Sequence, residues 1–123
     1  MVPTPFDVQT EVLEDGIRAF TVKGELDLNT APQLEKPLES AVAESNGDSS
    51  ILIDLSSCEF IDSTGIALIV RAWQQVDRDG DAGGKLVLCC PNDQVQRLLK
   101  ITGVESSISM HRGREDALSA LRA

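Results

Sequence analysis

Apolar and polar residues alternate near the start of the chain and then give way to apolar residues at helical spacing. Residues 6–13 and 17–23 are rich in strand-forming residues and flank Glu14-Asp15-Gly16. An Asp-Gly step between two such runs is a strong signal for a β-hairpin. We therefore expect two antiparallel strands here, preceded by a flexible N-terminus at residues 1–5.

A helix is predicted next, because the apolar residues between Ala31 and Val42 recur every three or four positions. Asn29 or Thr30 is expected to cap it, since short polar side chains accept the free N–H groups of a first helical turn. Pro37 lies inside this pattern and should kink the helix, because an interior proline removes a backbone hydrogen bond.

The remainder of the chain alternates between strand and helix patterns. Strands are predicted at about 50–55, 85–90 and 108–110, helices at about 63–78, 91–103 and 115–121, and turns at 46–48 and 79–84. The first two of these strands are nearly continuous in apolar residues, as strands covered by helices should be. A leading hairpin followed by this alternation predicts one α/β domain over residues 1–123.

The composition excludes several classes of protein. Hydrophobic residues make up 41% of the chain, which excludes a wholly disordered protein, and aromatic residues at 3% argue against a base-stacking surface. No apolar run approaches the roughly 20 residues of a membrane span, and the first ten residues lack the segments of a signal peptide. Cys58, Cys89 and Cys90 fit neither a disulfide framework nor a metal site. We expect a cytoplasmic protein without metal or cofactor.

The net charge of −9 is distributed unevenly along the chain. Residues 25–62 contain nine acidic residues and one basic residue, whereas residues 97–123 contain five basic and three acidic residues. Such an acidic half should avoid nucleic acid and anionic lipid and favour a partner with a basic face. It is equally compatible with a solvated surface that only keeps the protein soluble.

After the predicted strand at 50–55 we expect a short polar loop, which ends in Asp62-Ser63-Thr64-Gly65 at the start of a helix. A hydroxyl at that place can cap the helix, bind a phosphate at the free backbone N–H groups, or carry a phosphate covalently. Capping needs no further function, and Gly65 would then only permit a tight turn. A phosphate on Ser63, close to Asp62 and Glu59, would instead make this end strongly negative and repel a docked partner.

The helix predicted after Ser63 carries more apolar residues than one buried stripe requires. Its inward stripe comprises Ile66, Ile69, Val70 and Trp73, and the apolar surface is extended by Ala67, Leu68 and Ala72. This flank is either a protein-binding surface or the contact surface of a neighbouring helix.

Enzymatic alternatives require residues that the sequence supplies only in part. An aspartyl-phosphate enzyme with Asp62 as nucleophile needs further carboxylates for Mg²⁺ and a lysine, for which Asp54 and Lys85 are available. A Ser–His hydrolase needs Ser63 with His111, the single histidine, but no G-x-S-x-G motif is present. Glycine-rich nucleotide-binding motifs are also missing from the sequence. We therefore expect a protein that is not an enzyme.

Five segments occur in an order that is typical of one family. They are Gly24-Glu25-Leu26-Asp27, Thr30-Ala31-Pro32, Ile53-Asp54-Leu55, Phe60-Ile61-Asp62-Ser63-Thr64-Gly65 and Leu98-Leu99-Lys100-Ile101-Thr102-Gly103-Val104. Together they resemble the STAS domain family, and more closely its bacterial anti-sigma factor antagonists. The resemblance implies a STAS-like fold, with a mixed central sheet flanked by about four helices.

The same resemblance implies a phosphorylation site and a partner-binding surface. Ser63 would be the phosphoacceptor and Thr64 a secondary candidate. The partner-binding residues would be Asp27, Asp62, Ser63, Thr64, Gly65 and Ile66.

In this family the partner is an anti-sigma factor that is itself a serine kinase. The unmodified antagonist would bind it and free a sigma factor for transcription, for example in a stress response, and phosphorylation would release the antagonist. A PP2C-type phosphatase would restore the binding form. We expect a monomer or weak dimer; the alternative is a signalling scaffold of the same family that self-assembles.

Overall fold

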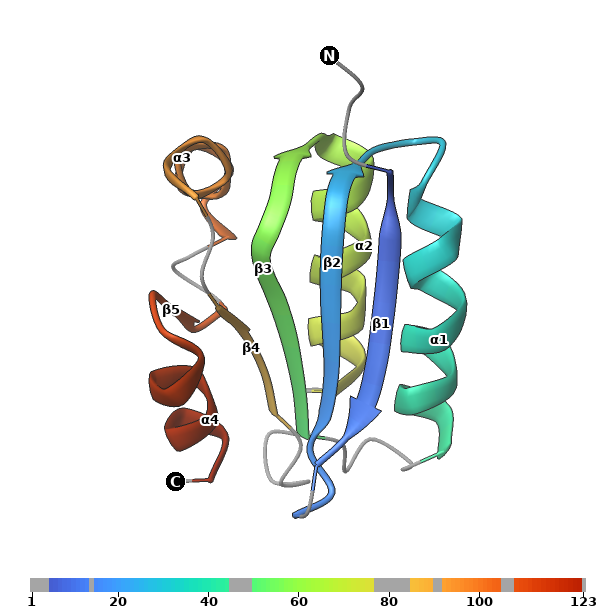
Figure 1. Ribbon diagram of the computed structural model, residues 1–123, viewed down its shortest axis with the longest axis vertical. Coiled ribbons are helices and arrows are strands. Elements are labelled where there is room, and N and C mark those ends of the chain that lie inside the picture. Colours follow the sequence, from blue (N-terminus) through green and yellow to red (C-terminus); the bar gives the residue numbers. More distant parts are fainter. Residues whose placement is uncertain are drawn as a thin grey trace.

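The computed structural model describes residues 5–13, 15–44, 50–76, 85–89, 92–104 and 108–122. Within these ranges, five strands form one sheet in the order β1-β2-β3-β4-β5, accompanied by four helices (Figure 1). The strands are β1 (Asp7–Val12), β2 (Arg18–Leu26), β3 (Ser50–Ile61), β4 (Lys85–Cys89) and β5 (Met110–His111). The helices are α1 (Ala31–Glu44), α2 (Ser63–Val76), α3 (Asp93–Ile101) and α4 (Arg114–Arg122). The predicted α/β fold with a mixed sheet is confirmed.

Strand direction determines where the loops of the molecule meet. β1 and β2 are antiparallel, and the turn between them includes Gly16, whose φ of +83° suits glycine. From β2 to β5, each strand runs parallel to the next. Parallel neighbours end at the same edge of a sheet, so the loops after β2 and β3 emerge side by side.

β2 and β3 are longer than the sequence pattern predicts. The segment after Leu55, predicted to be a polar loop, continues β3 as far as Ile61. Its partner is the extension of β2, in which Gly24 pairs with Cys58 and Leu26 with Ile61. The loop prediction was wrong because the polar residues lie on exposed positions of a strand that is held by a partner distant in sequence.

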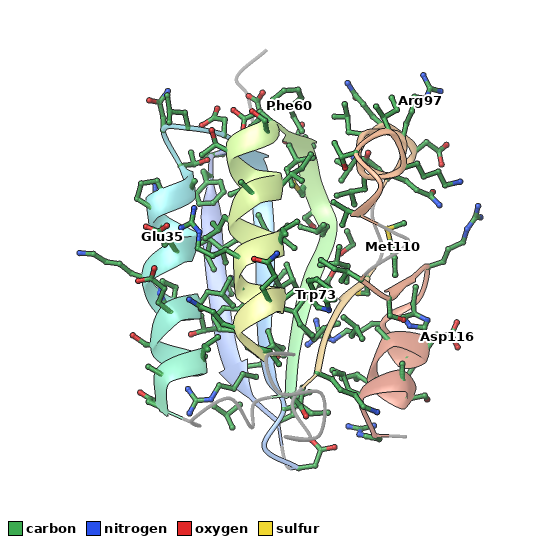
Figure 2. The ribbon with its side chains drawn as sticks, turned by 180° about the vertical axis from the view of Figure 1, so that it is seen from behind. Glu35, Phe60, Trp73, Arg97, Met110 and Asp116 are labelled. Atoms are coloured by element: carbon green, nitrogen blue, oxygen red, sulfur yellow. The ribbon has the colours of Figure 1, made fainter. Side chains whose placement is uncertain are left out.

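Alternate residues of each strand contribute to two apolar clusters on opposite faces of the sheet. The larger cluster joins strand residues such as Phe20, Ile53 and Leu88 to the inner faces of α1, α2 and α3. The smaller cluster joins Ala19 and other strand residues of the opposite face to α4. Figures 1 and 2 show α2 behind and in front of the sheet respectively, with α1 beside it.

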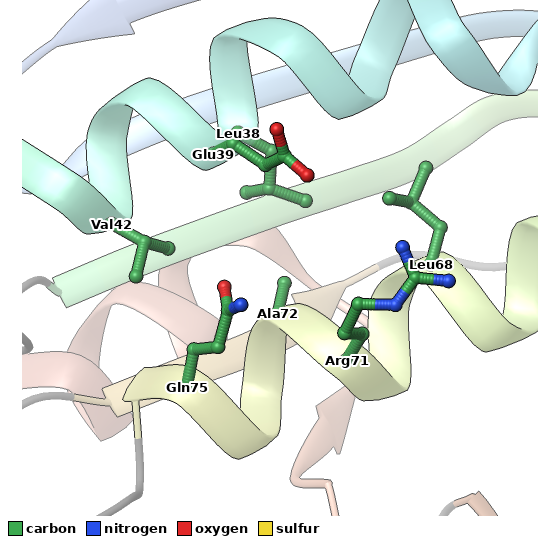
Figure 3. Close-up of a pocket in the computed structure, with 7 residues that line it drawn as sticks. All are labelled: Leu38, Glu39, Val42, Leu68, Arg71, Ala72 and Gln75. Carbon is green, nitrogen blue, oxygen red and sulfur yellow. The ribbon is translucent and has the colours of Figure 1, made fainter.

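The apolar flank of α2 is covered by α1, which settles the two alternatives for that surface. Leu38 and Val42 of α1 face Leu68 and Ala72 of α2 (Figure 3), and all four side chains are buried. The cavity between the helices measures only about 10 Å³, no more than one water molecule needs. Ala67, the third residue of the flank, is exposed, and it lies on the same face of α2 as the exposed Ser63.

The C-terminal elements lie close to their predicted positions. Asn92 caps α3, its side chain accepting the N–H of Val95 at 2.8 Å. The last strand is Met110–His111 rather than 108–110. The predicted turns at 46–48 and 79–84, with residues 1–4, Glu14, Cys90 and Pro91, lie outside the described residues. None of the helices in the described ranges has the length and apolar composition needed to cross a membrane.

A buried carboxylate joins three elements on the α4 side of the sheet. Asp54, in the middle of β3, is 5% exposed, and its Oδ2 accepts a hydrogen bond from Arg114 at 3.0 Å. Arg114 also donates to Glu11 of β1 at 2.8 Å. Burial raises the pKa of Asp54, but hydrogen bonds from Ser56, Cys89 and Arg114 outweigh it and hold the pKa below its ordinary value.

We expect Asp54→Asn to lower the free energy of unfolding at neutral pH by about 1–3 kcal/mol, because the amide removes the buried one of the two carboxylates that pair with Arg114. Because the pKa of Asp54 is lowered in the fold, its carboxylate stabilises the folded protein fully at a pH above the ordinary pKa of 3.8. This stabilisation is lost as the pH falls through the lowered pKa. Urea unfolding of both proteins over this pH range measures the difference. The difference should narrow with acidification; a gap that stays constant would contradict the assignment.

Candidate functional site

Two loops come together at the carboxyl edge of the sheet, one after β2 and one after β3. The N–H of Asp62 donates to the carbonyl of Leu26 at 3.2 Å, and the N–H of Leu28 donates to Asp62 Oδ2 at 3.3 Å. The structure therefore places Asp27 and the Asp62-Ser63-Thr64-Gly65 segment side by side, although they are far apart in sequence.

Asp62, and not a hydroxyl residue, caps α2. Its Oδ1 accepts the N–H of Thr64 at 2.9 Å and that of Gly65 at 3.1 Å, and its carbonyl accepts the N–H of Ile66 at 3.0 Å. A carboxylate at this place also interacts favourably with the positive end of the helix dipole. The first of the three possible roles for the hydroxyl, capping, is therefore taken by the preceding residue.

Ser63 is the first residue of α2, and its side chain is exposed. Thr64 is half-buried. Because Asp62 caps the helix, the fold does not require the Ser63 hydroxyl for the N-terminal turn. An exposed hydroxyl that the helix does not need is free to react with a group outside the molecule.

Asp27 caps the turn that leads into α1, which corrects the prediction of Asn29 or Thr30. Its Oδ1 accepts the N–H of Asn29 at 3.0 Å and that of Thr30 at 3.1 Å. In return, Thr30 Oγ1 accepts the N–H of Asp27 at 2.9 Å and donates to the carbonyl of Glu25 at 2.7 Å. This reciprocal arrangement resembles a capping box, and the Asp-x-x-Thr spacing is the sequence signal that the prediction overlooked.

Gly65 and Ile66 face inward, in contrast to Ser63. A Cβ atom on Gly65 would lie 2.8 Å from Leu26 Cγ and 2.9 Å from Ile61 Cγ1, so only glycine lets α2 approach the two strands this closely. Ile66 is 9% exposed and packs in the larger core cluster. Of the residues expected to bind a partner, these two therefore shape the site from beneath, and Ser63 is exposed beside the half-buried Asp27, Asp62 and Thr64.

Four acidic residues lie together at this edge of the sheet. Glu25 and Glu59 are exposed, and Asp27 and Asp62 are half-buried. Five other acidic residues of the described chain form ion pairs with arginine: Glu11 and Asp54 with Arg114, Asp15 with Arg122, Glu35 with Arg71, and Glu44 with Arg18. Exposed acidic residues such as Glu39 and Asp116 form no ion pair within the described ranges. No ion pair within the described ranges involves the four edge residues, and they leave a negative charge that the fold itself does not neutralise.

The residues needed by the enzymatic alternatives are engaged elsewhere. Both carboxylate oxygens of Asp62 accept backbone N–H groups, and Asp54 is paired with Arg114. His111 Nε2 lies 2.9 Å from Ser109 Oγ, so its hydrogen-bond partner is not Ser63. Within the described ranges, no group of three or more His, Cys, Asp or Glu side chains could hold a metal ion.

Comparisons with known proteins agree on one family. The model of the STAS domain matches residues 9–117. The anti-sigma-B factor antagonist of Staphylococcus aureus is 30% identical over 105 residues, which cover 83% of this chain and 90% of that protein.

Solved structures share the fold over most of the chain. An anti-sigma factor antagonist from Mycobacterium paratuberculosis superposes with a TM-score of 0.84 at 28% identity, covering 97% of this chain and 96% of that one. The Bacillus cell fate determinant SpoIIAA in its phosphorylated form superposes with a TM-score of 0.71 at 20% identity, covering 94% and 100%.

Gly65→Ala is expected to lower the free energy of unfolding by about 1–3 kcal/mol, because the added methyl group overlaps buried side chains. Helix propensity alone predicts the opposite sign, since alanine is favoured over glycine by about 1 kcal/mol inside a helix. Gly113→Ala is the control, since a Cβ there meets only Asp116 Oδ2, at 3.6 Å. Urea unfolding of the wild type and the two variants measures the difference in the free energy of unfolding. Stabilisation by Gly65→Ala would show that the close approach of α2 to the two strands is not needed.

Proposed function

We propose that this chain, which belongs to the STAS domain family, is an anti-sigma factor antagonist whose binding of its partner is controlled by phosphorylation of Ser63. The observation that carries the proposal is the exposed Ser63 hydroxyl at a helix start that Asp62 already caps. The relatives from Staphylococcus aureus and Mycobacterium paratuberculosis are named anti-sigma factor antagonists, which are regulatory proteins. A protein of the same fold has been solved in a phosphorylated form.

The partner in this proposal is an anti-sigma factor with serine kinase activity. It binds the unmodified chain and thereby releases a sigma factor. It then transfers the γ-phosphoryl group of ATP to Ser63 Oγ, with loss of the hydroxyl proton and release of ADP. A PP2C-type phosphatase hydrolyses the ester and restores the binding form. ATP is held by the kinase, and Thr64 is a secondary acceptor, disfavoured by its half-buried side chain.

The position of Asp62 explains why a phosphate on Ser63 would act on the partner. Thr64 and Gly65, whose N–H groups could otherwise bind a phosphate, already donate to Asp62 Oδ1. A phosphoserine would add about −1.5 to −2 charges beside this carboxylate and the exposed Glu59. A partner whose basic residues are already matched by the carboxylates of the edge would have to desolvate the phosphate without a further cation to compensate it, which disfavours the complex.

The fold should tolerate the modification. Ser63 is exposed at the surface end of α2, and the core beneath it is formed by Gly65 and Ile66. Phosphorylation would therefore change the surface charge without changing the packing, so that the switch acts on binding and not on folding.

We expect Ser63→Ala to fold normally, to gain no phosphoryl group and to bind the anti-sigma factor constitutively. Ser63→Asp should bind more weakly by about 1–3 kcal/mol, since its carboxylate supplies less charge than a phosphate. Intact mass spectrometry after incubation with the kinase and ATP measures the gain of a phosphoryl group. Calorimetry measures the affinity of each variant for the anti-sigma factor. Ser119→Asp, at an exposed serine of α4, is the control for added charge elsewhere.

Wild-type affinity for both Ser63 variants would contradict the switch. Native mass measurements complete the test: a monomer or weak dimer fits an antagonist, whereas a large, stable self-assembly would favour a scaffold of the same family.

A further inference from the structure

Three large hydrophobic side chains are strongly exposed in the described part of the chain. They are Val12, at 67%, Leu28, at 70%, and Ile101, at 74%. Val12 ends β1 at the opposite end of the sheet from the start of α2 (Figure 1). Of the three, Leu28 is the one whose backbone is hydrogen-bonded to the cap of the helix that begins with Ser63.

The backbone around Leu28 is fixed on both sides. Its own N–H donates to Asp62 Oδ2 at 3.3 Å, and the next two N–H groups, of Asn29 and Thr30, donate to Asp27 Oδ1. A side chain presented by a backbone with these restraints loses less conformational freedom on binding than one on a loose loop. The fold thus holds an apolar side chain in water at a defined position.

The surroundings of Leu28 indicate what could cover it. Asp27 precedes it, Asp62 binds its N–H group, and Glu25 and Glu59 complete the acidic edge that has no ion pair within the described ranges. An apolar centre with a polar rim is common in protein interfaces, and a few well-buried residues usually supply most of the affinity. The complementary surface is an apolar pocket surrounded by lysine or arginine.

We propose that Leu28 is the apolar anchor of the partner interface and inserts into a pocket of the anti-sigma factor that is rimmed by basic residues. This inference rests on the function proposed above and names the contact that carries its affinity. Asp62 is a positioning residue for this contact, because one of its oxygens holds the Leu28 backbone while the other caps the helix that presents Ser63. A partner seated on Leu28 would lie next to Asp62, the residue directly before Ser63, which connects the anchor to the phosphorylation site.

The first test replaces the anchor and measures binding to the purified anti-sigma factor that binds the wild-type chain. Leu28→Ala and Leu28→Lys should weaken binding by about tenfold or more. Val12→Lys, which places the same charge at a similarly exposed position away from the edge, should bind like the wild type. Leu28→Lys with wild-type affinity would overturn the inference. The same holds for equal losses in Leu28→Lys and Val12→Lys, since these would reflect added charge alone.

The second test asks whether Asp62 affects binding by positioning Leu28. Asp62→Asn keeps an oxygen for the Thr64 and Gly65 N–H groups, but its amide nitrogen cannot accept the Leu28 N–H group. It should weaken binding severalfold in the wild-type background and have little further effect in Leu28→Ala, while thermal unfolding stays near the wild type. Equal losses in both backgrounds would overturn the positioning role.

Failure of the inference is distinguishable from failure of the proposed function. If Ser63→Asp weakens binding and Leu28→Lys does not, the switch stands and the anchor is wrong. If the wild-type chain binds none of the organism's purified anti-sigma factor kinases, the proposed function is wrong and the anchor with it.

Discussion

The hydrogen bonds of one carboxylate organise this end of the molecule. Asp62 accepts two N–H groups of the first turn of α2 through Oδ1 and the Leu28 N–H group through Oδ2. It thereby caps α2 and joins the loop after β2 to the loop after β3. The Ser63 hydroxyl is then not needed to cap the helix. An alanine in place of Asp62 would forfeit all three hydrogen bonds at once, whereas an alanine at Ser63 removes none that the cap depends on.

This arrangement depends on the sheet beneath it. Parallel pairing brings the ends of β2 and β3 together, with Leu26 opposite Ile61, and Gly65 packs directly on both side chains. The distance between the two loops is therefore fixed by backbone pairing and close packing rather than by the loops themselves. A site built in this way can change its surface charge without changing its shape, as a switch that acts on binding requires.

Local signals predicted much of this molecule, and contacts between distant segments account for the rest. The hairpin at Asp15-Gly16 and the start of α3 near Asn92 follow from short sequence patterns. The extension of β3 to Ile61 does not, because its polar residues are held in a strand by β2. The Leu28–Asp62 hydrogen bond joins residues that only the fold brings together, so neither the fixed loop nor the exposed leucine was predictable.

Some acidic residues of the described chain are paired with arginine and others are not, and this distribution says more about binding than the net charge of −9 alone. Asp54 and Glu11 share Arg114, and further acids pair with Arg18, Arg71 and Arg122, so these charges are compensated within the fold. At the carboxyl edge no such compensation occurs in the described residues. Like charges gathered without counterions repel one another and oppose folding. In the function proposed above, a partner whose cations match the carboxylates would relieve that repulsion by binding. A phosphate on Ser63 would then add charge for which no cation is provided, so the edge suits an interaction that must be both formed and released.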